Sequence, residues 1–154
     1  MAGLPEGAVD AADIPDNACL IRRVPPLWVS KARPDTSNFR NKEAGFGLSV
    51  TLWAGDSDLE DILRDHEHCG VVTIVAADAR ALGLIIARSP LDGNPNHCEL
   101  FPAATKGRQN LLRNASEWVA YPEVIPPEQR KPVVSWRDHW EGRIPAEDIV
   151  RVCN

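Results

Sequence analysis

The chain has 154 residues, of which 44% are hydrophobic and 25% are charged, and its net charge is −5. This length fits one domain and this composition is that of an ordinary globular protein, which excludes a fibrous or largely disordered chain. The negative charge makes a nucleic-acid partner held through overall charge unlikely without excluding one.

The compartment is inferred from targeting signals and cysteine usage. The N-terminus lacks a basic stretch followed by an apolar one, and no apolar run approaches the ~20 residues of a membrane span. Cys19, Cys69, Cys98 and Cys153 are scattered without a Cys-x-x-Cys pair, so we expect reduced thiols. We therefore expect a cytoplasmic protein with no membrane partner.

Charge is unevenly distributed near the start of the chain. Residues 1–17 are acidic and broken by Pro5 and Pro15, which predicts a flexible acidic N-terminal tail before a single domain over 18–154. Residues 22–42 are basic, with Asp35 as their only carboxylate. This segment either meets a phosphate-bearing ligand or pairs with the neighbouring acidic helix.

The helices and strands are predicted from the spacing of hydrophobic residues and from the positions of turn-forming residues. Alternating or continuous apolar runs predict strands, and helical spacing with capping residues predicts helices. The expected strands are 19–24, 46–53, 71–76, 84–87, 98–101, 133–136 and 149–153. The expected helices are 58–68 and 105–119, with single helical turns at 78–82 and 145–148. This order predicts one α+β domain with a curved mixed, largely antiparallel sheet and two main helices.

Two local signals define the helix ends. Ser57 and Glu60 have the spacing of a capping box at the start of the first helix, and Gly70 is expected to stop it. In the second helix, Trp118 and Val119 continue the apolar spacing to the last turn.

Several chemistries are disfavoured by the motifs. The sequence lacks a Gly-rich phosphate loop, a Rossmann glycine fingerprint and a Gly-x-Ser-x-Gly elbow. His66, His68 and Cys69 are close in sequence, but positions i and i+2 of a helix point to different sides. We therefore predict no metal site.

A cation, a hydroxyl and a carboxylate occur in order along the chain. They are Arg22 or Arg23 on the first strand, Ser49 on the second (or Ser37 before it), and Glu99 after the third apolar region. This order resembles the Arg, Ser, Glu order of ADP-ribosyltransferase folds, without their Ser-Thr-Ser and Glu-x-Glu contexts. The resemblance implies NAD as a ligand, with the arginine on its diphosphate and the carboxylate beside the sugar.

These residues also have simpler interpretations. Arg22 and Arg23 are adjacent in a strand, so they point to opposite faces and at most one is expected to line a cleft. Ser49 and Glu99 would then be solvated strand residues.

His97 is the strongest single candidate for chemistry. It follows Asn94-Pro95-Asn96 and precedes a strand, and such a junction makes a side chain both rigid and accessible. It would act as a general acid or base beside Glu99, with Asn96 contacting the ligand, or it would only cap the turn through a backbone bond.

The sequence thus supports two functions. The first is a polar cleft for a phosphate-bearing ligand, a nucleotide or NAD, formed by Arg22 or Arg23, Ser49, Asn96, His97 and Glu99. The alternative is a non-catalytic module that binds a protein partner through Trp136 and Trp140, in a segment bounded by prolines.

Overall fold

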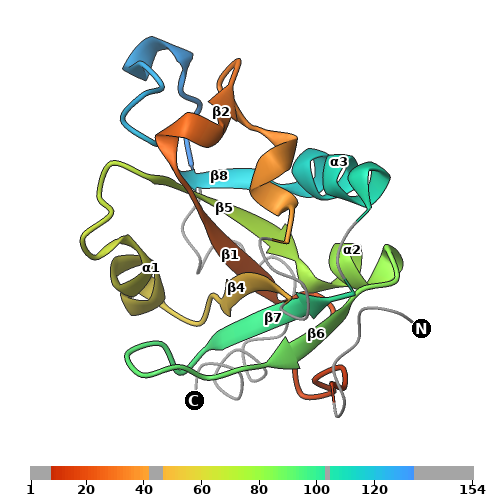
Figure 1. Ribbon diagram of the computed structural model, residues 1–154. Helices are drawn as coiled ribbons and strands as arrows, with labels where there is room; N and C mark the ends of the chain where they lie inside the picture. The colour runs from red at the N-terminus through yellow and green to blue at the C-terminus, as the bar shows by residue number, and fades with distance from the viewer. Residues whose placement is uncertain (1–7, 42–46, 103–104, 134–154) are drawn as a thin grey trace.

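A six-stranded sheet forms the centre of the protein, in the order β6-β7-β4-β1-β5-β8 (Figure 1). The structure is a computed structural model that describes residues 8–41, 47–102 and 105–133. The strands are β1 (Cys19–Val24), β4 (Leu48–Leu52), β5 (Gly70–Val75), β6 (Ile85–Arg88), β7 (His97–Phe101) and β8 (Glu117–Ala120). Every strand pair in the described residues is antiparallel.

Helices and a small hairpin surround this sheet. The helices of the described residues are α1 (Asp56–Leu63), α2 (Ala76–Ala81) and α3 (Lys106–Ala115), and the hairpin joins β2 (Val29–Ser30) to β3 (Arg33–Pro34). Short 3₁₀ turns occur at Pro26–Trp28, Thr36–Phe39 and Pro127–Gln129. The predicted α+β domain is confirmed, and none of these helices is long and apolar enough to cross a membrane.

The central strands bury side chains on both faces, and one of these faces carries the regularly alternating apolar residues. Leu20 stands between Leu52 and Ile74 in the register of three neighbouring strands, and all three side chains are buried. Ile86 and Leu100 continue this layer across β6 and β7. Burial of each such side chain stabilises the fold by about 1.5–3 kcal/mol.

The first helix differs from its prediction at both ends. It begins at Asp56, and Asp58 rather than Ser57 caps it, through an Oδ2 atom that accepts the backbone amides of Ala54 and Gly55 just before the helix. It ends at Leu63 rather than His68, because Asp65 has a left-handed backbone with φ of 64°. Gly70 therefore does not stop the helix but begins β5.

The last helix is shorter than its prediction. The amide and hydroxyl of Ser116 both bond to the Arg113 carbonyl, and the helix ends at Ala115. Trp118 and Val119 lie in strand β8, where Trp118 pairs with Val72 of β5. Helical spacing and strand alternation both fit this stretch, and pairing with a buried strand decided between them.

The described part of the acidic N-terminal segment packs on the domain. Ile14 is buried, and Asp10, Asp13 and Asp16 form salt bridges to two arginines of α2 and β6. The carboxylate of Asp10 also accepts the backbone amide of Ile86 on the edge strand. The segment from residue 8 onward therefore covers one edge of the sheet.

Some predictions concern residues outside the described part of the chain. These are the strand at 133–136 beyond Val133, the helical turn at 145–148, the strand at 149–153, and the tryptophans Trp136 and Trp140.

Candidate functional site

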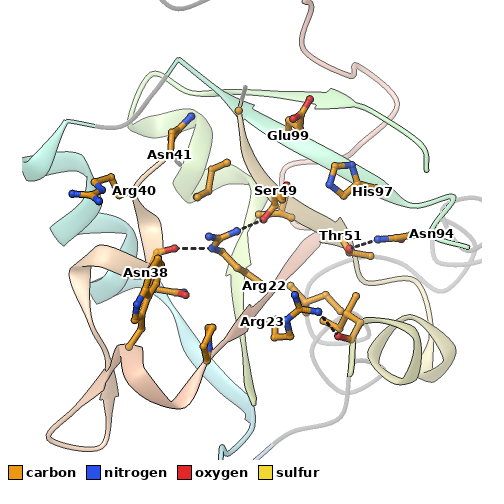
Figure 2. Close-up of a pocket in the computed structure, with 17 residues that line it drawn as sticks. Arg22, Arg23, Asn38, Arg40, Asn41, Ser49, Thr51, Asn94, His97 and Glu99 are labelled. Carbon is orange, nitrogen blue, oxygen red and sulfur yellow. Dashed lines mark hydrogen bonds between the residues drawn. The ribbon is translucent and has the colours of Figure 1, made fainter. Parts of the chain in front are cut away.

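The sheet opens between β1 and β4, and one arginine fills the opening. β1 pairs with β4 only at Leu20 and Ile21, although it continues beside β5 as far as Val24. Beyond that point the Ser49 carbonyl accepts a hydrogen bond from Arg22 Nη1 at 2.7 Å (Figure 2). Arg22 Nε donates to the carbonyl of Asn38 at 2.8 Å. The side chain of Arg22 thus supplies hydrogen bonds where β1 and β4 have separated and no longer pair.

A hollow of about 440 Å³ lies at this opening. We call it the β1–β4 hollow. Its described lining comprises Ile21, Arg22, Arg23, Pro25, Trp28, Asn38, Arg40, Asn41, Gly47, Leu48, Ser49, Val50, Thr51, Ile62, Asn94, His97 and Glu99. The structure thereby brings together five of the six predicted ligand-binding and catalytic residues.

Three arginines make one side of the hollow basic. Arg23 Nη1 donates to the Ile62 carbonyl at 3.0 Å and so caps the end of α1. Arg40 is exposed, and neither it nor Arg22 nor Arg23 forms a salt bridge within the described residues. Burial of the guanidinium, and secondarily the charge of Arg23, lowers the pKa of Arg22 to about 10. A bound anion would favour the charged form of Arg22 and so oppose both effects.

Both adjacent arginines line the hollow, so the expectation that at most one would do so was wrong. Strand alternation does send Arg22 and Arg23 to opposite faces. The hollow, however, lies where the strands part and not on one face of a continuous sheet. It can therefore be reached from both arginine positions.

A hydroxyl, a carboxylate and an imidazole form the opposite wall. In the register of β4 and β7, Ser49 stands opposite Glu99 and Thr51 stands opposite His97. Figure 2 shows Ser49, Glu99 and His97 along the same wall. Ser49 is exposed and Glu99 is half-buried, so both are accessible from the hollow, whereas His97 is buried, with 9% of its surface exposed, and is less accessible than expected. Neighbours of this kind across a β ladder have Cβ atoms about 4.5–5.5 Å apart.

The ring orientation of His97 is set by the loop before its strand. Its Nδ1 lies 2.7 Å from the Ser89 carbonyl oxygen. A carbonyl can only accept, so Nδ1 carries the hydrogen and, in the neutral ring, Nε2 is left as an acceptor. The backbone bond that was the simpler interpretation of His97 is present, and it also fixes the tautomer that a general base would need.

Asn38 was missed by the sequence reasoning. Its side chain lines the hollow, it is fully buried, and neither its amide nitrogen nor its amide oxygen has a hydrogen-bond partner in the described residues. Asp35 Oδ1 accepts the amide of Ser37 and starts the 3₁₀ turn that places Asn38 there. Buried unpartnered amides are rare and costly, which makes Asn38 a candidate for ligand contact. Only the Asp-Thr-Ser turn before it could have signalled its position.

The loop between β6 and β7 contributes Asn94 rather than Asn96 to the lining. Asn94 Nδ2 donates to Thr51 Oγ1 at 3.0 Å. Asn96 Nδ2 instead donates to Asp58 Oδ1 at 2.9 Å, which ties the loop to α1. Ser37, the alternative serine, is exposed and is not part of the lining.

No group of three or more His, Cys, Asp or Glu residues that could hold a metal ion occurs in residues 8–41, 47–102 and 105–133. Comparisons of the chain with protein-family models, with curated proteins and with solved structures found no match. The functional argument therefore depends on the residues of the hollow.

Proposed function

We propose that the β1–β4 hollow binds a phosphate-bearing ligand of the nucleotide or NAD class. The observation that carries this proposal is a convergence on one accessible hollow. It brings together three arginines and a buried amide that have no salt bridge and no hydrogen-bond partner, respectively, in the described part of the chain, and a carboxylate. Arginine is favoured for phosphate because its planar fork donates two parallel hydrogen bonds.

Arg22 is suited to hold phosphate because its geometry is fixed before binding. Its Nε and Nη1 atoms are anchored on two backbone carbonyls, and Nη2 has no partner within the described chain. A fixed guanidinium loses little conformational entropy when an anion binds. Arg40, exposed at the rim, would add a second, more mobile contact.

The opposite wall suits the reacting end of an NAD-like ligand. In ADP-ribosyl transfer the bond between the nicotinamide nitrogen and ribose C1′ breaks, and its electron pair leaves with nicotinamide. Glu99 would stabilise the positive sugar centre, the acceptor's oxygen or nitrogen would bond to C1′, and Glu99 or His97 Nε2 would take the acceptor's proton. The placement of Glu99 opposite Ser49 and two residues from His97 on the same strand supports this proposal.

Ligand-induced thermal stabilisation tests the binding proposal. NAD, ADP and inorganic phosphate are each added to the full chain. A ligand at ~100 times its Kd should stabilise the fold by ~2.7 kcal/mol, which corresponds to roughly 5–11 °C in Tm for a chain of this size. Arg40→Gln should reduce the shift, whereas Arg64→Gln, an exposed cation on the end of α1, should not.

Nicotinamide release tests the chemistry separately. Glu99→Gln keeps the shape of the side chain, so NAD should still raise the Tm of this variant as it does that of the wild type. The variant should, however, no longer release nicotinamide. No shift with any of the three ligands, or an equal loss in Arg40→Gln and Arg64→Gln, would show that the hollow is not an anion site.

The alternative function, partner binding through Trp136 and Trp140, concerns residues outside the described chain. It remains a separate proposal, tested by a pull-down that compares the wild type with the Trp136→Ala, Trp140→Ala variant.

A further inference from the structure

A second hollow lies at the other side of β1, beside the edge strand β8. Its volume is about 580 Å³, within the range of small-molecule sites. We call it the β8 hollow. Its described lining comprises Lys31, Ala32, Arg33, Pro34, Val72, Arg113, Ser116, Glu117, Trp118, Tyr121, Gln129, Lys131 and Pro132. It shares no described lining residue with the β1–β4 hollow.

This hollow takes Lys31 and Arg33 from the basic segment that the sequence shows at 22–42. Lys31 and Arg33 come from the hairpin between β2 and β3, which lies over β8 (Figure 1). Neither forms a salt bridge in the described residues, so the alternative that this segment pairs with an acidic helix has no support there. Arg113 and Lys131 bring the described lining to four cations against Glu117.

One of these cations has a donor that the fold leaves unused. Arg113 Nε is buried and has no hydrogen-bond partner among the described residues. Arg33 Nη2, by contrast, donates to Asn114 Oδ1 at 2.9 Å and is thereby held at the rim. The hollow therefore combines one oriented guanidinium with one whose Nε has no hydrogen-bond partner among the described residues.

Two aromatic rings form a rigid wall of the same hollow. Trp118 Nε1 donates to the Ala32 carbonyl at 3.0 Å, which fixes the indole against the hairpin. The Tyr121 hydroxyl accepts the backbone amide of Lys131 at 3.0 Å. The two ring centroids are 5.5 Å apart and the planes are inclined by 30°. Both residues are half-buried, so part of each remains accessible.

We propose that the β8 hollow is a second site that binds a nucleotide unit, with its base against the Trp118–Tyr121 wall and its phosphate on the surrounding cations. Aromatic side chains beside lysine and arginine are the combination that binds single-stranded nucleic acid, because every base has a π face and every unit a phosphate. The local excess of cations matters here more than the net charge of −5, which is spread over the whole chain.

A free nucleotide and a single strand share this chemistry, and the experiment separates them. Fluorescence polarisation of a labelled oligouridylate is measured with the full chain, and unlabelled UMP and AMP compete for binding. Strand binding without competition identifies a single strand as the ligand. Competition at similar affinity identifies the free nucleotide.

Variants test whether the β8 hollow is responsible. Tyr121→Leu should weaken binding about 5- to 150-fold, the loss expected for one stacked base, while Tyr121→Phe, which keeps the ring, should bind nearly as the wild type does. Lys31→Gln with Lys131→Gln should reduce the salt slope by about 1.4, at ~0.7 per phosphate contact on a single strand. Both lysines are exposed, so this double variant should fold even if Tyr121→Leu does not.

The matched control removes two exposed cations outside both hollows, through Arg64→Gln with Lys106→Gln. Unchanged affinity in this control and in Arg40→Gln supports the proposal and separates it from the β1–β4 hollow. The proposal is overturned if the wild type binds neither oligouridylate nor mononucleotide. It is also overturned if the control double variant loses as much affinity as the lysine pair.

Discussion

The carboxylate of Asp58 connects α1 to the loop that precedes His97, and its removal should be among the costliest single changes in the described chain. Asp58 is buried, and Oδ2 accepts the amides of Ala54 at 2.8 Å and Gly55 at 3.0 Å. Its Oδ1 accepts from Asn96 Nδ2 at 2.9 Å. Asp58→Ala removes the acceptor of three hydrogen bonds, at ~1–3 kcal/mol for each donor that finds no other partner, less where water can enter. We expect a loss of about 3–5 kcal/mol in the free energy of unfolding.

Asp58→Asn should be much milder, because the new amide oxygen can still accept from Ala54 and Gly55. The new NH₂ group would face Asn96, whose own amide can rotate to offer its oxygen. Only the charge of the acceptor is then lost, and we expect the free energy of unfolding to fall by about 1–2 kcal/mol. Asn96→Ala should cost about 1 kcal/mol, and the double variant with Asp58→Ala should cost less than the sum.

Urea unfolding followed by tryptophan fluorescence measures these differences, since Trp53 is fully buried in the core. Midpoints should fall in the order wild type, Asp58→Asn, Asp58→Ala, with unchanged m values. An Asp58→Ala loss below ~1 kcal/mol would refute the reasoning, because it would mean that the three donors find other partners. Additive losses in the double variant would show that Asn96 and Asp58 do not interact.

Two further predictions concern thiols and the acidic segment. Cys19, Cys69 and Cys98 are buried, and burial raises the pKa of the Cys98 thiol to about 11. Peptide mapping after alkylation of the native protein at pH 8 should therefore find all three thiols unmodified. Rapid labelling of Cys98 would contradict its placement. The hydrogen bond from Arg88 lowers the pKa of the Asp13 carboxyl below its ordinary value of 3.8. The stabilisation of the fold by this pair is therefore fully present above pH 3.8 and is lost as the pH falls through the pKa of the folded state. In Arg88→Gln, NMR titration should show the Asp13 carboxyl pKa rising toward 3.8, and an unchanged value would mean that the pair does not form in solution.

Local pattern was sufficient for the strands of the core. The alternation in β1 predicted its bounds at Cys19 and Val24, and the apolar runs of β5 and β7 were placed within one residue. These strands are buried on at least one face, and a one-residue slip would turn their apolar side chains toward water. The sequence pattern therefore determines them almost completely.

Element ends were predicted less well because they depend on contacts distant in sequence. Helical spacing continued through Trp118, yet pairing with Val72 placed that residue in β8. The last turn of α1 is also capped by Arg23, whose guanidinium bonds to the Ile62 carbonyl from 39 positions away. Propensity and spacing over a short window contain no information about such partners.

The candidate site was likewise predictable in its residue types but not in the placement of those residues. The sequence by itself identified which residue types could serve a phosphate-bearing ligand, because the chemistry of Arg22, Ser49, His97 and Glu99 is fixed by their side chains. Only the tertiary structure decided that they share a hollow and that Arg23 joins them. It also decided that the Asn38 amide is buried there with no hydrogen-bond partner among the residues that the structure describes. The physical reason is the divergence of β1 from β4: strand separation is set by the packing of whole elements, and no local pattern along either strand encodes it.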